Sequence, residues 1–209
     1  MDLRHATSKW WIAILVSIAL LITWPVASGA PNPANVRRYQ QQLLDLGYWL
    51  PSVNGLVDRD TTHAVIAFQK VAGLPRNGLL DDATKQGIEK EIRPAAQSEI
   101  KQRIIEVDVA KQILKVVKDG RVLWILDVST GKPSTPTKRG FSRIYREYDG
   151  LRASGMYRPK YFWRSAAIHG YATVPNYAAS HGCVRVTNTV MDWLWKKDAL
   201  PSGMSIWVY

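Results

Sequence analysis

Cysteine is nearly absent from this chain of 209 residues, because Cys183 is the only one. A lone cysteine cannot form an internal disulfide, so it is a small buried residue, an intermolecular bridge or a reactive thiol. With only four histidines, no zinc-ligand constellation is visible, and no glycine-rich phosphate loop occurs. We therefore predict no metal and no cofactor.

Acidic residues are also scarce. Lys and Arg number 28 against 17 Asp and Glu, which gives a formal charge of +11. The excess of basic residues lies in the C-terminal half, and above all in 132–165. This segment contains nine basic residues and only two acidic ones, Glu147 and Asp149. A charge run alone is typical of a solvated face. The alternative is a collar that attracts a carboxylate-rich substrate.

No apolar run is long enough for a comfortable bilayer span, which needs about 20 residues. Arg4 and Lys9 precede an uncharged, mainly apolar stretch from Trp10 to Trp24, and small residues follow up to Ala30. This layout predicts a secretory signal in 1–30, cleaved near Ala30, with an uncleaved membrane anchor as the alternative. We expect an exported protein of the cell wall, extracellular space or periplasm, which disfavours nucleic acid as a partner.

A repeat recurs at a spacing of 23 residues. Asn54-Gly55 and Asn77-Gly78 each supply a tight turn, and an Asp and a Thr three residues apart follow each turn and can cap a helix. Together with helical apolar spacing before and between the copies, the pattern predicts three short helices, the last ending near Ile92.

Segment 36–90 resembles the peptidoglycan-binding helical module. The shared pattern comprises Gln40 to Gln42, Leu46-Gly47-Tyr48, Asn54-Gly55, Thr61, Ala64-Val65, Phe68-Gln69 and Gly73-Leu74. The resemblance implies a domain at 34–92 that binds wall glycan and peptide, whereas the repeat alone leaves open a helical domain without a ligand. Residues 93–102 are interpreted as a linker.

From residue 103 the periodicity changes from helix to strand. An Asp119-Gly120 turn separates two β-branched runs and predicts a hairpin. Thr187 or Asn188 could cap one late helix, and the chain ends in an apolar strand at Ser205 to Tyr209. The prediction for 103–209 is a mainly β domain with one helix near its end.

Two clusters in this domain carry chemistry, Ile168-His169-Gly170 and Ser180 to Arg185. A thiol with the ordinary pKa of about 8.5 is only slightly ionised at neutral pH, so it needs an imidazole or a cation beside it. His169, His181 and Arg185 are the candidates for activating Cys183.

The Ser-His-Gly-Cys-x-Arg core at 180–185, with Ser129 to Lys132 and the aromatic run at 161–163, is similar to the L,D-transpeptidase catalytic domain of the YkuD type. The resemblance implies a β-sandwich or barrel over 103–209. It makes Cys183 the nucleophile and His169 its base, with the Gly170 carbonyl orienting the ring.

The resemblance also places an oxyanion hole at the backbone amides from His181 through Gly182 to Cys183. His181 and Arg185 either position substrate or shape the loop, and for Arg185 a structural salt bridge is an equal alternative. The residues expected to contact substrate are Arg185, Ser180, Tyr161 and Trp163. The family's Thr-Pro-x-Gly is replaced by Thr137 to Gly140, with Lys138 and Arg139 inside it, which affects substrate preference.

The chain as a whole is thus expected to be a two-domain wall enzyme, a three-helix peptidoglycan-binding module followed by a catalytic β domain. The implied reaction joins stem peptides by 3→3 cross-links with release of D-alanine, and carbapenems are implied inhibitors. The alternatives are an L,D-carboxypeptidase, a cysteine endopeptidase of the wall, or a non-catalytic wall-binding protein.

Overall fold

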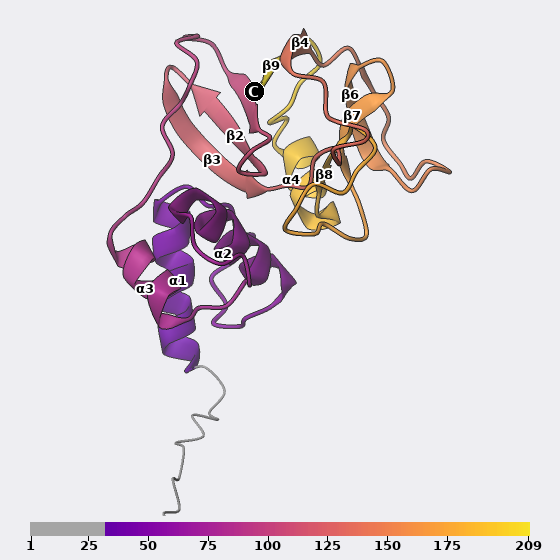
Figure 1. The fold of residues 1–209 in the computed structure, drawn as a ribbon. Helices are drawn as coiled ribbons and strands as arrows, with labels where there is room; N and C mark the ends of the chain where they lie inside the picture. The colour runs from indigo at the N-terminus through magenta and orange to yellow at the C-terminus, as the bar shows by residue number, and fades with distance from the viewer. Residues whose placement is uncertain (1–31) are drawn as a thin grey trace, which may run out of the picture. The chain divides into compact units, whose positions relative to one another are not determined.

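The computed structural model describes residues 32–209, which belong to one compact unit (Figure 1). The predicted signal or anchor at 1–30 lies outside the described residues. Within 32–209 no helix combines the length and the hydropathy needed to cross a membrane.

Three helices come first, α1 (Pro33–Asp45), α2 (Arg59–Ala72) and α3 (Asp82–Glu89). The predicted caps are confirmed, because the Asp58 and Asp81 side chains accept from the amides of Thr61 and Thr84 at 2.8 and 2.9 Å. The third helix ends three residues before the predicted Ile92.

Buried glutamines explain why the sequence repeats. Gln40 and Gln69 are both 0% exposed, and their Oε1 atoms accept from the amides of Gly55 and Gly78 at 2.8 and 2.9 Å. Their Nε2 atoms donate to the turn Asn and to the threonine at the start of the next helix. Each Asn-Gly turn is therefore fixed to the preceding helix by one fully satisfied amide side chain.

Two sheets follow. The first has the order β3-β2-β1-β9-β4, from β1 (Ile104–Asp108), β2 (Ile113–Lys118), β3 (Arg121–Asp127), β4 (Gly140–Arg143) and β9 (Ser205–Val208). The second has the order β5-β6-β7-β8, from β5 (Arg146–Glu147), β6 (Tyr157–Trp163), β7 (Ala166–Gly170) and β8 (Val184–Val186). The predicted hairpin joins β2 to β3, with positive φ at both turn residues.

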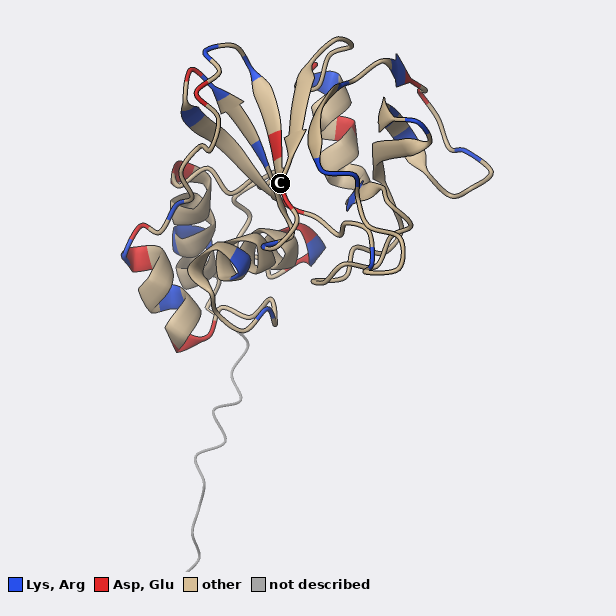
Figure 2. Ribbon diagram, turned by 45° about the horizontal axis from the view of Figure 1, so that its top comes forward, with Lys and Arg blue, Asp and Glu red and all other residues tan. Residues whose placement is uncertain are grey.

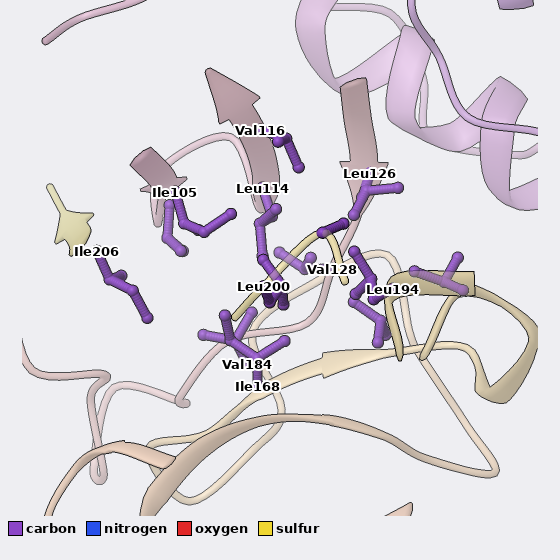
Figure 3. Packing of buried hydrophobic residues seen from close by; sticks show 14 of the residues in the cluster. Ile105, Leu114, Val116, Leu126, Val128, Ile168, Val184, Leu194, Leu200 and Ile206 are labelled. Carbon is purple, nitrogen blue, oxygen red and sulfur yellow. The ribbon is translucent and has the colours of Figure 1, made fainter. Parts of the chain in front are cut away.

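One hydrophobic core lies between the two sheets and α4 (Asn188–Lys196), which Thr187 caps. Figure 3 shows that Leu114 and Val128, which belong to the side of the first sheet, face Ile168 and Val184 of the second sheet. All four side chains are 0% exposed. The predicted fold class, a three-helix module with a mainly β sandwich, is confirmed.

A second core joins the helices to the first sheet. The backbone at Gly47 and Trp49 pairs with Ile125 of β3, with N···O distances of 2.8 and 3.1 Å. Tyr48 and Phe68 pack edge to face in this core, at 5.4 Å between ring centroids. The helical part and the β part therefore share buried apolar surface.

The segment at 93–102 has no regular structure, yet it is fixed to the sheet. The Glu106 carboxylate accepts from the amides of Gln97 and Ser98 and pairs with Lys115, whose ammonium also donates to the Ala95 carbonyl. Glu106 and Lys115 are 0% and 1% exposed. This covered ion pair ties the chain between the helices and β1 to the sheet's surface.

Candidate active site

Parallel strands β7 and β8 bring the two predicted clusters together. His169 is the partner of Arg185, and Ile168 is the partner of Val184. Ile168 and Val184 point into the core, so by strand alternation His169 and Arg185 project from the opposite face. Cys183 lies one residue before β8 and two residues before Arg185.

The His169 ring has one nitrogen fixed. Its Nδ1 lies 2.9 Å from the Gly170 carbonyl oxygen, and because a carbonyl can only accept, Nδ1 carries the proton. Nε2 is then the basic nitrogen. The contact that the resemblance implied between His169 and Gly170 is present.

Burial favours the neutral forms of His169 and Cys183. It lowers the pKa of His169 to about 4, an effect that the Gly170 carbonyl opposes and the Arg185 charge adds to. Burial also raises the pKa of the Cys183 thiol, against the smaller lowering effects of the Ala167 amide and Arg185. At neutral pH Cys183 is therefore a thiol and His169 a neutral imidazole.

Ser180 shapes the loop that presents the thiol. Its hydroxyl donates to the Cys183 carbonyl at 2.6 Å and accepts from the Gly182 amide at 3.2 Å. Ser180 is 1% exposed, so it supports the loop from within instead of facing substrate as expected. The Gly182 amide is engaged by Ser180, and Gly182 has a φ of 110° that favours glycine.

The Ser129 to Lys132 segment holds this loop from its other side. Ser129 and Arg185 exchange backbone hydrogen bonds at 3.1 and 2.9 Å. Thr130 accepts from the Ser180 amide at 2.9 Å, and the Lys132 amide donates to Ser180 at 3.0 Å. The segment thus supports the loop before Cys183 through backbone hydrogen bonds.

A cleft of about 560 Å³ opens beside Cys183. It is lined by Pro136, Thr137, Lys138, Arg139, Trp163, Arg164, Ser165, Ala166, His181 and Gly182. The Cys183 sulfur lies 4.0 Å from the Ser165 carbonyl oxygen, which places the cleft next to the thiol. Three lining residues are cationic and none is acidic, so the cleft suits an anionic ligand.

Only some of the residues that were expected to contact or position substrate line this cleft. Trp163 and His181 line the cleft, whereas Tyr161 is 5% exposed and lies under the Arg146 guanidinium, 4.2 Å from its ring centroid. Arg185 stacks on Tyr171 at 4.2 Å, and within residues 32–209 its buried Nε has no hydrogen-bond partner. Tyr161 and Arg185 therefore do not line the cleft.

Sequence reasoning missed Tyr171, whose ring meets His169 edge to face at 5.7 Å between centroids. Tyr171 lies two residues after His169. Side chains two residues apart in a strand share a face, so the sequence could have placed Tyr171 beside His169. Arg164 and Ser165 were also missed as cleft residues, because they lie in the turn between β6 and β7 and carry no motif.

Part of the basic segment is structural. Lys160 is 2% exposed and pairs with Glu147 at 2.6 Å, and Arg158 pairs with Asp149 and Asp192 at 2.7 and 2.8 Å. Figure 2 shows both signs of charge on the three N-terminal helices and a predominance of basic residues along the loops of the second sheet. The three cationic residues that line the cleft are therefore only part of the nine basic residues at 132–165.

No cluster of three or more His, Cys, Asp or Glu side chains gathers closely enough to hold a metal ion anywhere in 32–209. The chemistry that the site offers is that of a thiol, an imidazole, backbone amides and nearby cations.

Comparison with known proteins agrees with this geometry. The L,D-transpeptidase catalytic domain (YkuD) matches residues 102–208, and a peptidoglycan binding domain matches 32–87. An L,D-transpeptidase from Xylanimonas cellulosilytica is 38% identical, with a TM-score of 0.80 over 84% of this chain and 93% of that one. An L,D-transpeptidase from Stackebrandtia nassauensis is 19% identical, with a TM-score of 0.53 over 87% and 94%, and shares the fold.

Proposed function

Because the chain belongs to the L,D-transpeptidase family with a YkuD catalytic domain, we propose that it forms 3→3 cross-links between peptidoglycan stem peptides through a Cys183 thioester. The observation that carries this proposal is the parallel pairing of β7 with β8, which brings the strand of His169 beside the strand that Cys183 immediately precedes. The cleft supports the proposal as well, because Ser165 and Gly182 line it and the Cys183 sulfur lies 4.0 Å from the Ser165 carbonyl oxygen.

In the first half-reaction the Cys183 sulfur attacks the carbonyl carbon of the third residue of a tetrapeptide stem. His169 takes the thiol proton on Nε2 as the carbon–sulfur bond forms. The oxyanion is stabilised by the amides of His181 and Cys183, since the Gly182 amide is occupied by Ser180. The bond to D-alanine then breaks, and His169 returns the proton to the departing amine.

In the second half-reaction an amine of a neighbouring stem attacks the thioester carbon. His169 accepts a proton from that amine, the new amide bond forms, and the sulfur leaves and regains a proton. If water replaces the amine, the same site releases a tripeptide and acts as an L,D-carboxypeptidase.

The charge of the cleft supports a stem peptide as substrate. Lys138, Arg139 and Arg164 line it, and stem peptides carry carboxylates. Lys138 also lies 5.8 Å from the Trp163 ring centroid, so the wall of the cleft offers an apolar face beside its cations. An extended acidic peptide fits this combination.

The helical part is the proposed wall anchor, with domains at 34–92 and 103–209 and a connecting segment at 93–102. A groove of about 470 Å³ among the helices and turns is lined by Tyr39, Val57 and Leu79 together with polar side chains. Val57 and Leu79 are 41% and 58% exposed. Such a mixed surface is suited to the apolar faces and hydroxyls of a glycan.

We place the protein on the outer side of the cytoplasmic membrane, where peptidoglycan is assembled, and assign the segment at 1–30 to export or anchoring. Carbapenems follow as acylating inhibitors of Cys183, because their strained carbonyl would be attacked in place of the stem carbonyl.

Two experiments test the proposal. Incubation of the purified chain with a carbapenem should give a covalent adduct by mass spectrometry, and the Cys183→Ala variant should give none. If the wild type forms no adduct, or if the Cys183→Ala variant forms as much adduct as the wild type, the proposed enzyme mechanism is refuted. The non-catalytic wall-binding protein would then be the remaining alternative.

Chromatography of muropeptides after incubation with the purified chain separates the remaining alternatives. A transpeptidase yields 3→3 dimers and free D-alanine, and a carboxypeptidase yields tripeptide monomers. An endopeptidase yields shorter fragments without dimers, and that outcome would refute the proposed reaction.

A further inference from the structure

The loop at 171–179, here called the bridging loop, connects the strand of His169 to the loop of Cys183. Asn176 in this loop lies seven positions from both His169 and Cys183 in the sequence. The Arg76 guanidinium donates to the Asn176 carbonyl at 3.2 Å, and the Asn176 side-chain amide donates to the Arg76 carbonyl at 2.5 Å. Arg59, at the start of α2, donates to the Ala172 carbonyl at 2.5 Å.

The opposite side of the bridging loop is fixed to the catalytic scaffold. The Ser129 hydroxyl donates to the Tyr177 carbonyl at 2.7 Å, and the Ala179 amide donates to Thr130 at 2.9 Å. The bridging loop is therefore held between the helical part and the segment that supports the nucleophile.

We propose that Arg76 and Asn176 are positioning residues, through which the helical part sets the geometry of Cys183 against His169. This inference rests on the proposed function, because its effect is read in the reactivity of the thiol. It gives the helices a role in catalysis that does not depend on their binding the wall.

The pairing is suited to this role because it is reciprocal. Each residue offers one side-chain donor and one backbone acceptor, so the pair fixes both position and orientation. Neither residue lines the cleft beside the thiol. Loss of the pair would leave the bridging loop attached at its ends, and a displacement of about 1 Å at a reacting group costs up to about a hundredfold in rate.

A second route joins the same parts. The Lys70 ammonium of α2 donates to the Val128 carbonyl at 2.8 Å, directly before Ser129. Ser129 in turn contacts both Arg185 and Tyr177. Removal of the Arg76–Asn176 pair should therefore weaken the positioning of Cys183 without abolishing it.

The test measures the rate constant for carbapenem acylation of Cys183 in the full chain. A carbapenem carries no glycan, so wall binding by the helices cannot contribute. The variants are Arg76→Ala, Asn176→Ala, the double variant and Arg76→Lys, which keeps a donor. Lys90→Ala is the matched control, because Lys90 is an exposed cation of the helical part far in sequence from the bridging loop contacts.

We expect about a tenfold lower acylation rate constant in each alanine variant, a double variant no worse than about twentyfold, and partial recovery in Arg76→Lys. Lys90→Ala should match the wild type. The midpoint of thermal unfolding should change by no more than a few degrees, which separates misplacement of the thiol from loss of folded protein.

Wild-type rates in both alanine variants would overturn the inference, as would losses that only follow the unfolded fraction measured at the same temperature. If the wild type itself forms no adduct, the proposed function fails first. A reactive wild type with equally reactive variants refutes only the role of Arg76 and Asn176.

Discussion

The Gly170 carbonyl accepts a hydrogen bond from His169 Nδ1 at 2.9 Å, so the residue that follows His169 fixes the tautomer of its ring. The same glycine has no space for a side chain. A Cβ there would lie 2.6 Å from Asn188 Oδ1 and 3.0 Å from the Tyr157 ring. The orientation of the imidazole therefore depends on close contact between β7 and the start of α4.

Gly170→Ala should damage both stability and reactivity. The added Cβ would displace the Asn188 side chain and, because it would lie 3.2 Å from Asn188 Cα, would also press β7 away from the start of α4. This overpacking typically costs about 1–3 kcal/mol, and the displacement would move the Gly170 carbonyl relative to His169 Nδ1. We expect the rate constant for acylation of Cys183 by a carbapenem to fall at least tenfold. Urea denaturation measures the accompanying loss in the free energy of unfolding. Adding Asn188→Ala to Gly170→Ala should recover part of the lost stability and part of the lost acylation rate. A Gly170→Ala variant that is acylated as fast as the wild type would contradict the role assigned to the Gly170 carbonyl.

The pH dependence should show an acid limb far below the usual range of histidine. Burial lowers the pKa of His169 to about 4, so the ring stays neutral and able to accept a proton as the pH falls from 7 to 5. We expect kcat/KM for a stem tetrapeptide to hold through this window and to fall as the pH approaches 4. An acid limb near 6.5 would show that the working ring is solvated.

The motif residues of the candidate site could be selected from the sequence, because each of the two motifs, 169–170 and 180–185, is a continuous segment. The aromatic run was harder to interpret. Tyr161 and Trp163 would share a face in a regular strand, but the pairing of β6 with β7 shifts register between them, and only Trp163 reaches the cleft. An irregularity of this kind depends on the partner strand, so spacing within the run could not reveal it.

The burial of several polar residues was also not predictable from the sequence. A glutamine on a helix and a Glu or Lys in a strand are usually exposed, yet Gln40, Gln69, Glu106 and Lys115 are nearly inaccessible. Each is buried by chain that arrives from elsewhere in the sequence. The turn residues that they contact were visible in the repeat, but the side chains that satisfy those turns were not.

The cationic cleft should favour stems whose carboxylates are free over stems in which they are amidated. Arg139→Ala removes one lining charge, and we expect KM for a carboxylate-bearing tetrapeptide to rise about threefold to fivefold, since one exposed ion pair contributes up to about 1 kcal/mol. KM for the amidated tetrapeptide should change little. The difference should shrink as ionic strength increases.

Arg152→Ala is the matched control for this charge. Arg152 belongs to the same basic segment, but it stacks on Tyr148 at 4.8 Å and does not line the cleft. It should leave the preference for the free carboxylate unchanged. Equal effects of the two variants would mean that the general field of the segment, and not the cleft, attracts the substrate.

Asp127 should be the most sensitive position between the helical and β parts. Its carboxylate, 2% exposed, pairs with the Lys70 ammonium and with His63 Nδ1, the latter at 2.6 Å. Asp127→Ala leaves the Lys70 charge buried without its counter-ion, and removing one partner of a buried pair costs about 3–5 kcal/mol. Urea denaturation should show a loss of that size, and a loss below about 1 kcal/mol would mean that water reaches Lys70.

The pH dependence of the Asp127→Ala variant identifies the cause of its instability. Burial already lowers the pKa of Lys70, while Asp127 raises it, so removal of Asp127 lowers that pKa further. The unfolded variant then binds more protons than the folded one, and its stability should rise with pH as Lys70 is deprotonated in the folded state. Lys70→Met added to Asp127→Ala should recover stability and abolish this rise, because the uncompensated charge is gone while the apolar length of the side chain remains.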